Sequence, residues 1–187
     1  MDYLLRAFAV ALREKPEALL LVVSPLVSET HEAEQKRLAD ELGISRSIIW
    51  ISPHTLQDLP SYLALADVCV VPRPECPGHP VKLLNYMLAG KPVVSFAGGA
   101  KGVRHLHDAF IVPNHDYEAL GRGMVTLLND QSLAHELGAN ARATVLAEFD
   151  WRQICRKIER IYDRLVGAAS APAATLPGPL PSAAADR

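Results

Sequence analysis

The sequence has few cysteines and no long apolar run, and both shortages limit the kind of protein it encodes. Cys69, Cys76 and Cys155 are odd in number and follow no metal-ligand spacing, which favours reduced thiols over a disulfide framework. The apolar spans, such as 18–23, are far shorter than the roughly 20 residues that a membrane helix needs, and Met1 begins no signal peptide. We therefore expect a cytoplasmic protein without a transmembrane segment, and peripheral contact with a membrane stays open.

An excess of one charge and the common catalytic motifs are also missing. Nineteen basic and 21 acidic residues give a net charge of -2, so no broad basic face for nucleic acid is expected. The chain contains no zinc spacing, no GxGxxG after the first predicted strand, no Walker sequence and no GxSxG elbow. These absences argue against a metal site, and against the dehydrogenase, kinase and hydrolase functions that an α/β fold would otherwise allow.

Apolar runs alternate with amphipathic segments along most of the chain, and hydrophobic residues make up 49% of its 187 residues, enough for the core of one domain. Strands are predicted at 18–23, 47–51, 67–71, 92–96 and 109–113. Helices are predicted at 3–13, 28–42, 56–66, 80–89, 117–128, 132–147 and 152–165. This alternation predicts an α/β fold, a doubly wound parallel sheet. Residues 1–166 are expected to form the domain, and the Ala- and Pro-rich residues 167–187 a flexible tail.

The stretch Pro72–Val94 joins two predicted strands through a proline-rich loop and a short helix. Gly78 has no side chain, so a ligand can come close to the backbone just before the helix. The N-terminus of a helix presents unpaired N–H groups and the positive end of the helix dipole, so this turn is suited to holding a phosphate. The same spacing also fits an ordinary turn of an α/β domain.

The segment Leu83–Val94, Leu-Leu-Asn-Tyr-Met-Leu-Ala-Gly-Lys-Pro-Val-Val, resembles the donor-site segment of glycosyltransferases with the GT-B fold. These belong to the large retaining family of glycosyl transferases group 1 (family 4), which includes sucrose and mannosyl transferases. The likeness extends over roughly residues 2–165 and covers the C-terminal, Rossmann-like half that binds the nucleotide sugar. It implies transfer of a sugar from a nucleoside diphosphate sugar to an unknown acceptor, with retention and without a metal ion or other cofactor.

The family pattern has one Glu that contacts the donor sugar and, eight positions later, a second Glu that holds the ribose hydroxyls. Asn85 stands at the second position and Pro77 at the first. An amide still hydrogen-bonds a diol, but more weakly than a carboxylate does. Glu75 lies two residues before Pro77. Either a two-residue insertion brings Glu75 to the sugar as the candidate catalytic contact, or it is a solvated loop acid and the role is unfilled.

The resemblance also implies a set of donor-binding residues. Gly78, His79 and Pro80 match residues whose backbone follows the diphosphate and the sugar, and Pro80 has no N–H to offer. The imidazole of His79 is more often an ordinary surface group than a proton carrier. The complete candidate set is Ser52, His54, Arg73, Gly78, His79, Pro80, Val81, Lys82 and Asn85.

The other members of this set lie at the ends of predicted strands or at the start of the helix. Ser52 and His54 follow a strand beside the expected nucleotide base. Arg73 and Lys82 are either diphosphate ligands or ordinary surface cations. Gly98, Gly99 and Lys101 follow the next strand, where they either line the cleft or turn the chain.

In the enzymes that the chain resembles, this domain begins with a strand and a glycine-containing loop whose Arg and Lys neutralise the diphosphate. Met1 and Asp2 stand where that loop should end, so the first, central strand is expected to be missing. Three explanations remain open: a fragment or truncated gene, a subunit completed by a separate N-terminal GT-B domain, or a sheet that closes the gap. In the first two the isolated chain should be inactive.

Two other functions stay open beside the glycosyltransferase. The departures at Pro77 and Asn85 fit a catalytically inactive module that binds a nucleotide sugar or has a regulatory role. A nucleotide-sugar epimerase of the same fold is the second alternative.

Overall fold

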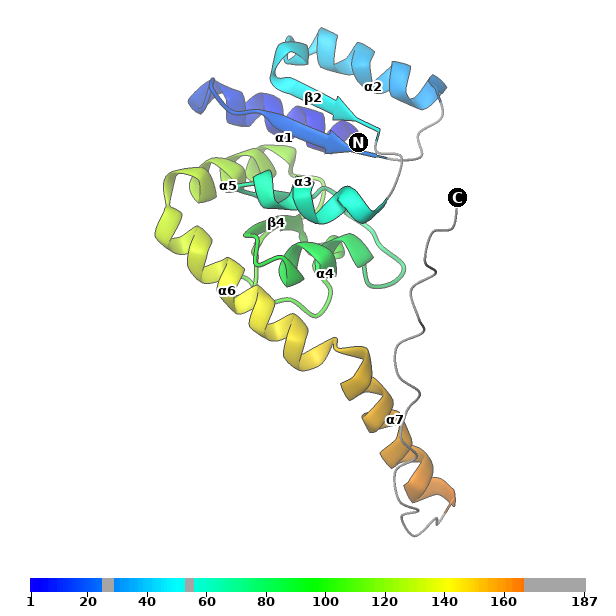
Figure 1. The fold of residues 1–187 in the computed structure, drawn as a ribbon. Coiled ribbons are helices and arrows are strands. Elements are labelled where there is room, and N and C mark those ends of the chain that lie inside the picture. Colours follow the sequence, from blue (N-terminus) through cyan, green and yellow to red (C-terminus); the bar gives the residue numbers. More distant parts are fainter. Residues whose placement is uncertain (25–28, 53–55, 167–187) are drawn as a thin grey trace, which may run out of the picture. The chain divides into compact units, whose positions relative to one another are not determined.

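The computed structural model describes residues 1–24, 29–52 and 56–166 (Figure 1). Two compact units are distinguished, Met1–Phe149 and Asp150–Arg187, and each is described by itself. The domain end expected after residue 166 stays a prediction, and the expected tail lies outside the described residues.

The first unit alternates helices with parallel strands, which confirms the predicted α/β fold class. Its strands are β1 (Leu20–Val23), β2 (Ile48–Ile51), β3 (Cys69–Val71), β4 (Val93–Phe96) and β5 (Phe110–Val112). Its helices are α1 (Asp2–Glu14), α2 (Glu29–Glu41), α3 (Leu59–Leu65), α4 (Val81–Leu88), α5 (Tyr117–Asn129) and α6 (Gln131–Glu148). Short 3₁₀ turns lie at Ser45–Ser47, Leu56–Asp58 and Ala97–Gly99, and the second of these replaces the first turn of the helix predicted at 56–66.

Local capping sets several helix ends. The side chain of Asp116 accepts a hydrogen bond of 2.8 Å from the N–H three residues on, and α5 begins after it as predicted. The side chain of Asp130 likewise accepts a hydrogen bond of 2.9 Å from the N–H of Leu133. Helix α6 therefore begins at Gln131 and not at the predicted Ser132. Gly90, with φ of +68°, takes the left-handed conformation that ends α4.

The five strands form two separate parallel sheets. β1 pairs with β2, and β3, β4 and β5 pair in that order. Within the described residues β1 and β3 are not paired, so the break falls where the central strand was expected to be missing. Of the three explanations, a sheet that closes the gap is not what the structure shows.

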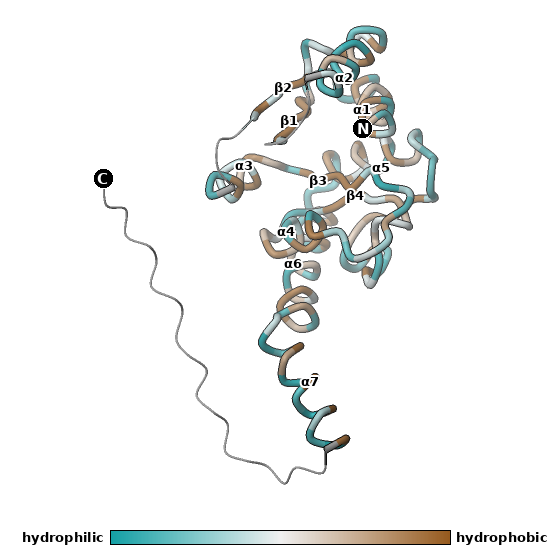
Figure 2. The backbone as a smooth tube through the Cα atoms, turned by 90° about the vertical axis from the view of Figure 1, so that its right-hand side faces the viewer, coloured by the Kyte–Doolittle hydropathy of each residue, from teal (hydrophilic) through white to brown (hydrophobic). Residues whose placement is uncertain are grey.

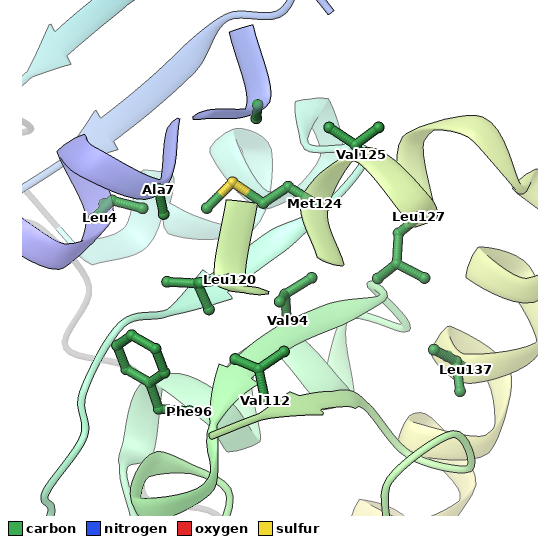
Figure 3. Packing of buried hydrophobic residues seen from close by; sticks show 11 residues of the cluster. Leu4, Ala7, Val94, Phe96, Val112, Leu120, Met124, Val125, Leu127 and Leu137 are labelled. Carbon is green, nitrogen blue, oxygen red and sulfur yellow. The ribbon is translucent and has the colours of Figure 1, made fainter. Parts of the chain in front are cut away.

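Helix α1 joins the two sheets through its apolar residues. Leu4 and Ala7 enter a cluster with α5, β4 and β5, and Figure 3 shows their side chains beside those of α5. Leu5 and Phe8 enter a second cluster with β1 and β2. Helix α5 approaches so closely that a Cβ on Gly121 would lie 2.5 Å from the carbonyl oxygen of Ala7. Each fully buried leucine here contributes about 1.5–3 kcal/mol, so α1 stabilises both sheets.

The second unit contains α7 (Trp151–Val166), along which hydrophobic and hydrophilic residues alternate with a helical period (Figure 2). By this spacing Ile154, Ile158 and Leu165 share one face and Arg156 and Arg160 share another. None of the described helices is long and apolar enough to cross a membrane.

Candidate functional site

Residues 72–80, here called the donor loop, connect the end of β3 to the start of α4. The backbone of Pro80 is extended and the helix begins at Val81. In the described part of the chain no side chain caps this helix, and its first turn contains no acidic residue. The N–H of Leu83 donates to the carbonyl oxygen of Pro80 at 2.9 Å, which leaves those of Val81 and Lys82 at the start of the helix for an anion.

The turn at Gly78 is open. A Cβ built on Gly78 would meet no atom within 4 Å, and Gly78 itself is exposed. Val81 and Lys82, in the first turn of α4, are also exposed, whereas Pro80 is buried. Among the described residues, no atom lies where a side chain of Gly78 would begin, so this side of the turn is open.

The donor loop and α4 also carry two of the predicted cations and one amide. Arg73 and Lys82 are exposed, and Asn85 is half-buried. Lys82 and Asn85 are three residues apart on α4 and therefore lie on the same face. A cation in the first turn is unfavourable beside the positive end of the helix dipole unless an anion is bound, so Lys82 suits a phosphate ligand.

Glu75 and Pro77 are both exposed on the donor loop. The loop carries the carboxylate two positions before the place where the family pattern has one. The role of Glu75 as a sugar contact stays a prediction.

His79 is held by packing through its ring. The ring centroids of His79 and Phe149 lie 5.0 Å apart in an edge-to-face arrangement. A Cβ on Gly102 would lie 3.1 Å from Cε1 of the same imidazole. His79 is exposed, yet its ring packs against Phe149 and so helps to hold the position of the loop.

Of the two residues predicted near the nucleotide base, only Ser52 belongs to the described part of the chain. Ser52 is exposed at the carboxyl end of β2, in the two-stranded sheet, where it lines a narrow depression with Ser24 and Gln35. The other predicted residues follow β3 in the three-stranded sheet. His54 lies outside the described residues.

A second loop, residues 97–102, supports the donor loop and is here called the glycine loop. A Cβ on Gly98 would lie 1.7 Å from the carbonyl oxygen of Pro74, so only glycine fits there. The N–H of Gly98 donates to Oδ1 of Asn114 at 2.8 Å, and Nζ of Lys101 donates to the carbonyl oxygen of Cys76. Sequence reasoning missed Asn114, although its place directly after β5, at the carboxyl edge of a parallel sheet, was a usable signal.

A buried carboxylate fixes the segment between the glycine loop and β5. Asp108 is fully buried and accepts hydrogen bonds from Nε of Arg104 at 3.0 Å and from Oγ1 of Thr144 at 2.6 Å. Burial alone would raise the pKa of Asp108, but these bonds and one with His107 outweigh it and hold the pKa well below its usual range. This cluster could not be predicted from the sequence, because an acid in a loop usually lies in water.

Cys69 lies in β3 directly before the donor loop, yet its thiol is not reactive. Burial raises the pKa of Cys69 to about 12, although Lys91 acts in the opposite direction. The thiolate is the nucleophilic form, so this cysteine is a packing residue of the strand.

The family model and the similar proteins all point to glycosyltransferases. The model described as glycosyl transferases group 1 matches residues 1–130. The D-inositol 3-phosphate glycosyltransferase of Salinispora arenicola is 32% identical over 179 residues, which cover 89% of this chain and 39% of that protein. A GDP-mannose-dependent monoacylated alpha-(1-6)-phosphatidylinositol monomannoside mannosyltransferase of Corynebacterium glutamicum is 26% identical over 167 residues, covering 86% and 42%.

Solved structures show the same fold. Sucrose-phosphate synthase from Thermosynechococcus elongatus matches with a TM-score of 0.75 and 25% identity, covering 90% of this chain and 43% of that one. HepE of Anabaena, in complex with UDP and glucose, matches with a TM-score of 0.76 and 21% identity, covering 87% and 44%. The chain thus spans between 39% and 44% of the length of these four proteins. The chain belongs to the glycosyl transferases group 1 family and has the Rossmann-like fold of one half of a GT-B enzyme.

Proposed function

We propose that the chain is the donor-binding domain of a glycosyltransferase that moves a sugar from a nucleoside diphosphate sugar to an acceptor. The observation that carries the proposal is the uncapped N-terminus of α4 beside the open turn at Gly78. Arg73, on the donor loop, and Lys82, in the first turn of α4, are both exposed cations. The relatives named above, one of them solved with UDP and glucose, support a nucleotide sugar as the ligand.

In this proposal the chain stabilises the departing diphosphate. Negative charge grows on the diphosphate as its bond to the sugar breaks, and donors fixed in advance stabilise that charge more strongly than water does. The N–H groups of Gly78, His79 and Val81 supply hydrogen bonds, and Arg73 and Lys82 supply positive charge. Asn85, one turn along α4, holds the ribose hydroxyls through its amide.

Retention at the sugar carbon and independence from a metal ion are the finer parts of the proposal, and both depend on the likeness to the family. The acceptor site and any group that activates the acceptor would belong to an N-terminal domain that these 187 residues do not contain. The isolated chain would therefore bind the donor without transferring its sugar.

The two-sheet structure supports a polypeptide partner. β1 and β3 each have one edge without a paired strand in the described part of the chain, although α1 packs against both sheets. Backbone N–H and C=O groups at such edges are left to water or to another strand. We propose that a parallel strand from an N-terminal GT-B domain, or from a partner subunit, fills this break.

A second function is favoured by two departures from the family pattern. Pro77 and Asn85 replace both glutamates, so a module that binds the nucleotide sugar without turnover is the alternative. Supplying an N-terminal GT-B domain of a relative and measuring sugar transfer from UDP-glucose and GDP-mannose separates the two. Transfer supports the enzyme, and binding without transfer supports the module.

The nucleotide site is tested by titrating UDP and GDP into the chain and following backbone amide shifts by NMR. At least one nucleotide should bind and shift the amides of Gly78 and His79. Asn85→Ala should weaken that binding by about 1–2 kcal/mol, because it removes the hydrogen bond to the ribose. Asn129→Ala, at an exposed position at the end of α5, is the matched control and should bind like the wild type.

Two results would contradict these assignments. If neither nucleotide shifts the amides around Gly78, the donor-site proposal is wrong. If a nucleotide binds but Asn85→Ala leaves its affinity unchanged, the ribose assignment alone is wrong.

A further inference from the structure

We propose that Lys101 is a positioning residue for the donor site, which it serves by tying the middle of the donor loop to the glycine loop. The ammonium group of Lys101 donates a hydrogen bond to the carbonyl oxygen of Cys76, two residues before Gly78. This inference rests on the proposed function, because it concerns how the same phosphate-binding turn is held in place.

The composition of the donor loop explains why hydrogen bonds from outside the loop are needed to hold it. Four of its nine residues are prolines, which have no N–H to donate. A loop of this kind holds few hydrogen bonds of its own, so its carbonyl oxygens are the groups by which neighbours hold it. The carbonyl of Cys76 is used in this way.

The glycine loop packs against the donor loop through close backbone contacts. A Cβ on Gly99 would lie 2.9 Å from the carbonyl oxygen of Arg73, and one on Gly98 would lie 1.7 Å from that of Pro74. These contacts are backbone against backbone and set how near the loops lie. The bond from Lys101 adds a directional, charge-assisted tie, which is stronger than a neutral hydrogen bond.

The glycine loop is itself anchored to the sheet. Oδ1 of Asn114, just after β5, accepts the N–H of Gly98 at 2.8 Å. A continuous set of contacts thus leads from β5 through Asn114 and the glycine loop to Cys76. Residues that bind a ligand work best when a second set of contacts fixes their geometry, and here that set holds the amides of Gly78 and His79.

The test compares Lys101→Met with Lys91→Met. Lys91 also donates from Nζ to a backbone carbonyl, that of Ala64 at 2.9 Å, but Ala64 lies in α3 and not in the donor loop. NMR order parameters of the Gly78 and His79 amides, the thermal unfolding midpoint, and the affinity for UDP and GDP are measured on each variant.

Lys101→Met should lower the order parameters of Gly78 and His79 from about 0.85, typical of rigid backbone, to below about 0.6. It should also weaken nucleotide binding about tenfold, the loss expected for one charge-assisted hydrogen bond. Lys101→Arg should restore both, since it keeps a cationic donor. Lys91→Met should change neither, and Asn114→Ala should loosen the same two amides by releasing Gly98.

The proposal is overturned if Lys101→Met leaves Gly78 and His79 as rigid as Lys91→Met does. It is also overturned if the loss of order spreads over the whole chain with a fall in the unfolding midpoint, since that is a general effect on the fold. If the wild type binds neither nucleotide, the proposed function fails, while the order parameters still decide the role of Lys101.

Discussion

At the scale of single residues, the fully buried carboxylate of Asp108 is held by several hydrogen bonds. It accepts hydrogen bonds from the backbone N–H and the guanidinium of Arg104, from the hydroxyl of Thr144 and from the ring of His107. Three residues, two from a loop and one from α6, thus meet at one side chain. A carboxylate placed in this way binds its proton less readily when the chain is folded than when it is unfolded. Its contribution to stability must therefore depend on pH.

Asp108→Asn should lower the free energy of unfolding at pH 7 by about 1–3 kcal/mol, because it replaces charge-assisted hydrogen bonds with neutral ones. The stabilisation by Asp108 is complete above its unfolded-state pKa of about 3.9 and is lost as pH falls towards the lower folded-state value. Urea unfolding at pH 7 and pH 3 should show the difference between wild type and variant shrinking in acid. Asp67→Asn, at an exposed position, is the control. A constant difference across pH would contradict this role.

At the scale of elements, the packing of α6 on α4 depends on a glycine. A Cβ on Gly138 would lie 2.2 Å from the carbonyl oxygen of Gly90, at the end of α4. Gly138→Ala should push the helices apart and cost about 1–3 kcal/mol, as overpacking of a close contact does. Urea unfolding measures this cost. Ala143→Leu enlarges an exposed residue of the same helix and should cost little. Equal stability of the two variants would show that the contact is not tight.

The same contacts show which parts of the fold the sequence could predict. Asp116 and Gly90 act within a few residues of the helix ends they set, and the helices predicted at 117–128 and 80–89 begin or end beside them. The approaches of Gly98 to Pro74 and of Gly138 to Gly90, and the bond from Thr144 to Asp108, join residues far apart in the chain. Periodicity carries no information on such pairs. The turn between β3 and α4 was therefore predictable, whereas the contacts that hold it were not.

At the scale of the whole molecule, the two-sheet arrangement should appear in hydrogen exchange. β4 is paired on both sides, whereas β1 and β3 are each paired on one side in the described residues. Amides of β4 should exchange more slowly than those of β1 and β3, because an unpaired edge opens more easily. Mass spectrometry of fragments from each strand measures this difference.

Supplying an N-terminal GT-B domain with its following strand should slow exchange in β1 and β3 and leave β4 unchanged. The same domain without that strand is the control. If β1 and β3 already exchange as slowly as β4 in the chain alone, their edges are not free and the proposed partner strand has no place.

The glycine loop contacts the donor loop through main-chain carbonyl oxygens. This bears on how the preference for a proposed sugar donor could change. The contacts described above involve backbone atoms of Arg73, Pro74 and Cys76, and not the side chains of Glu75 and Pro77. In the proposed donor site, replacements at these two positions would alter what meets the sugar while the turn keeps its shape. Evolution, or a designer of new donor specificity, could then vary them with little penalty to folding.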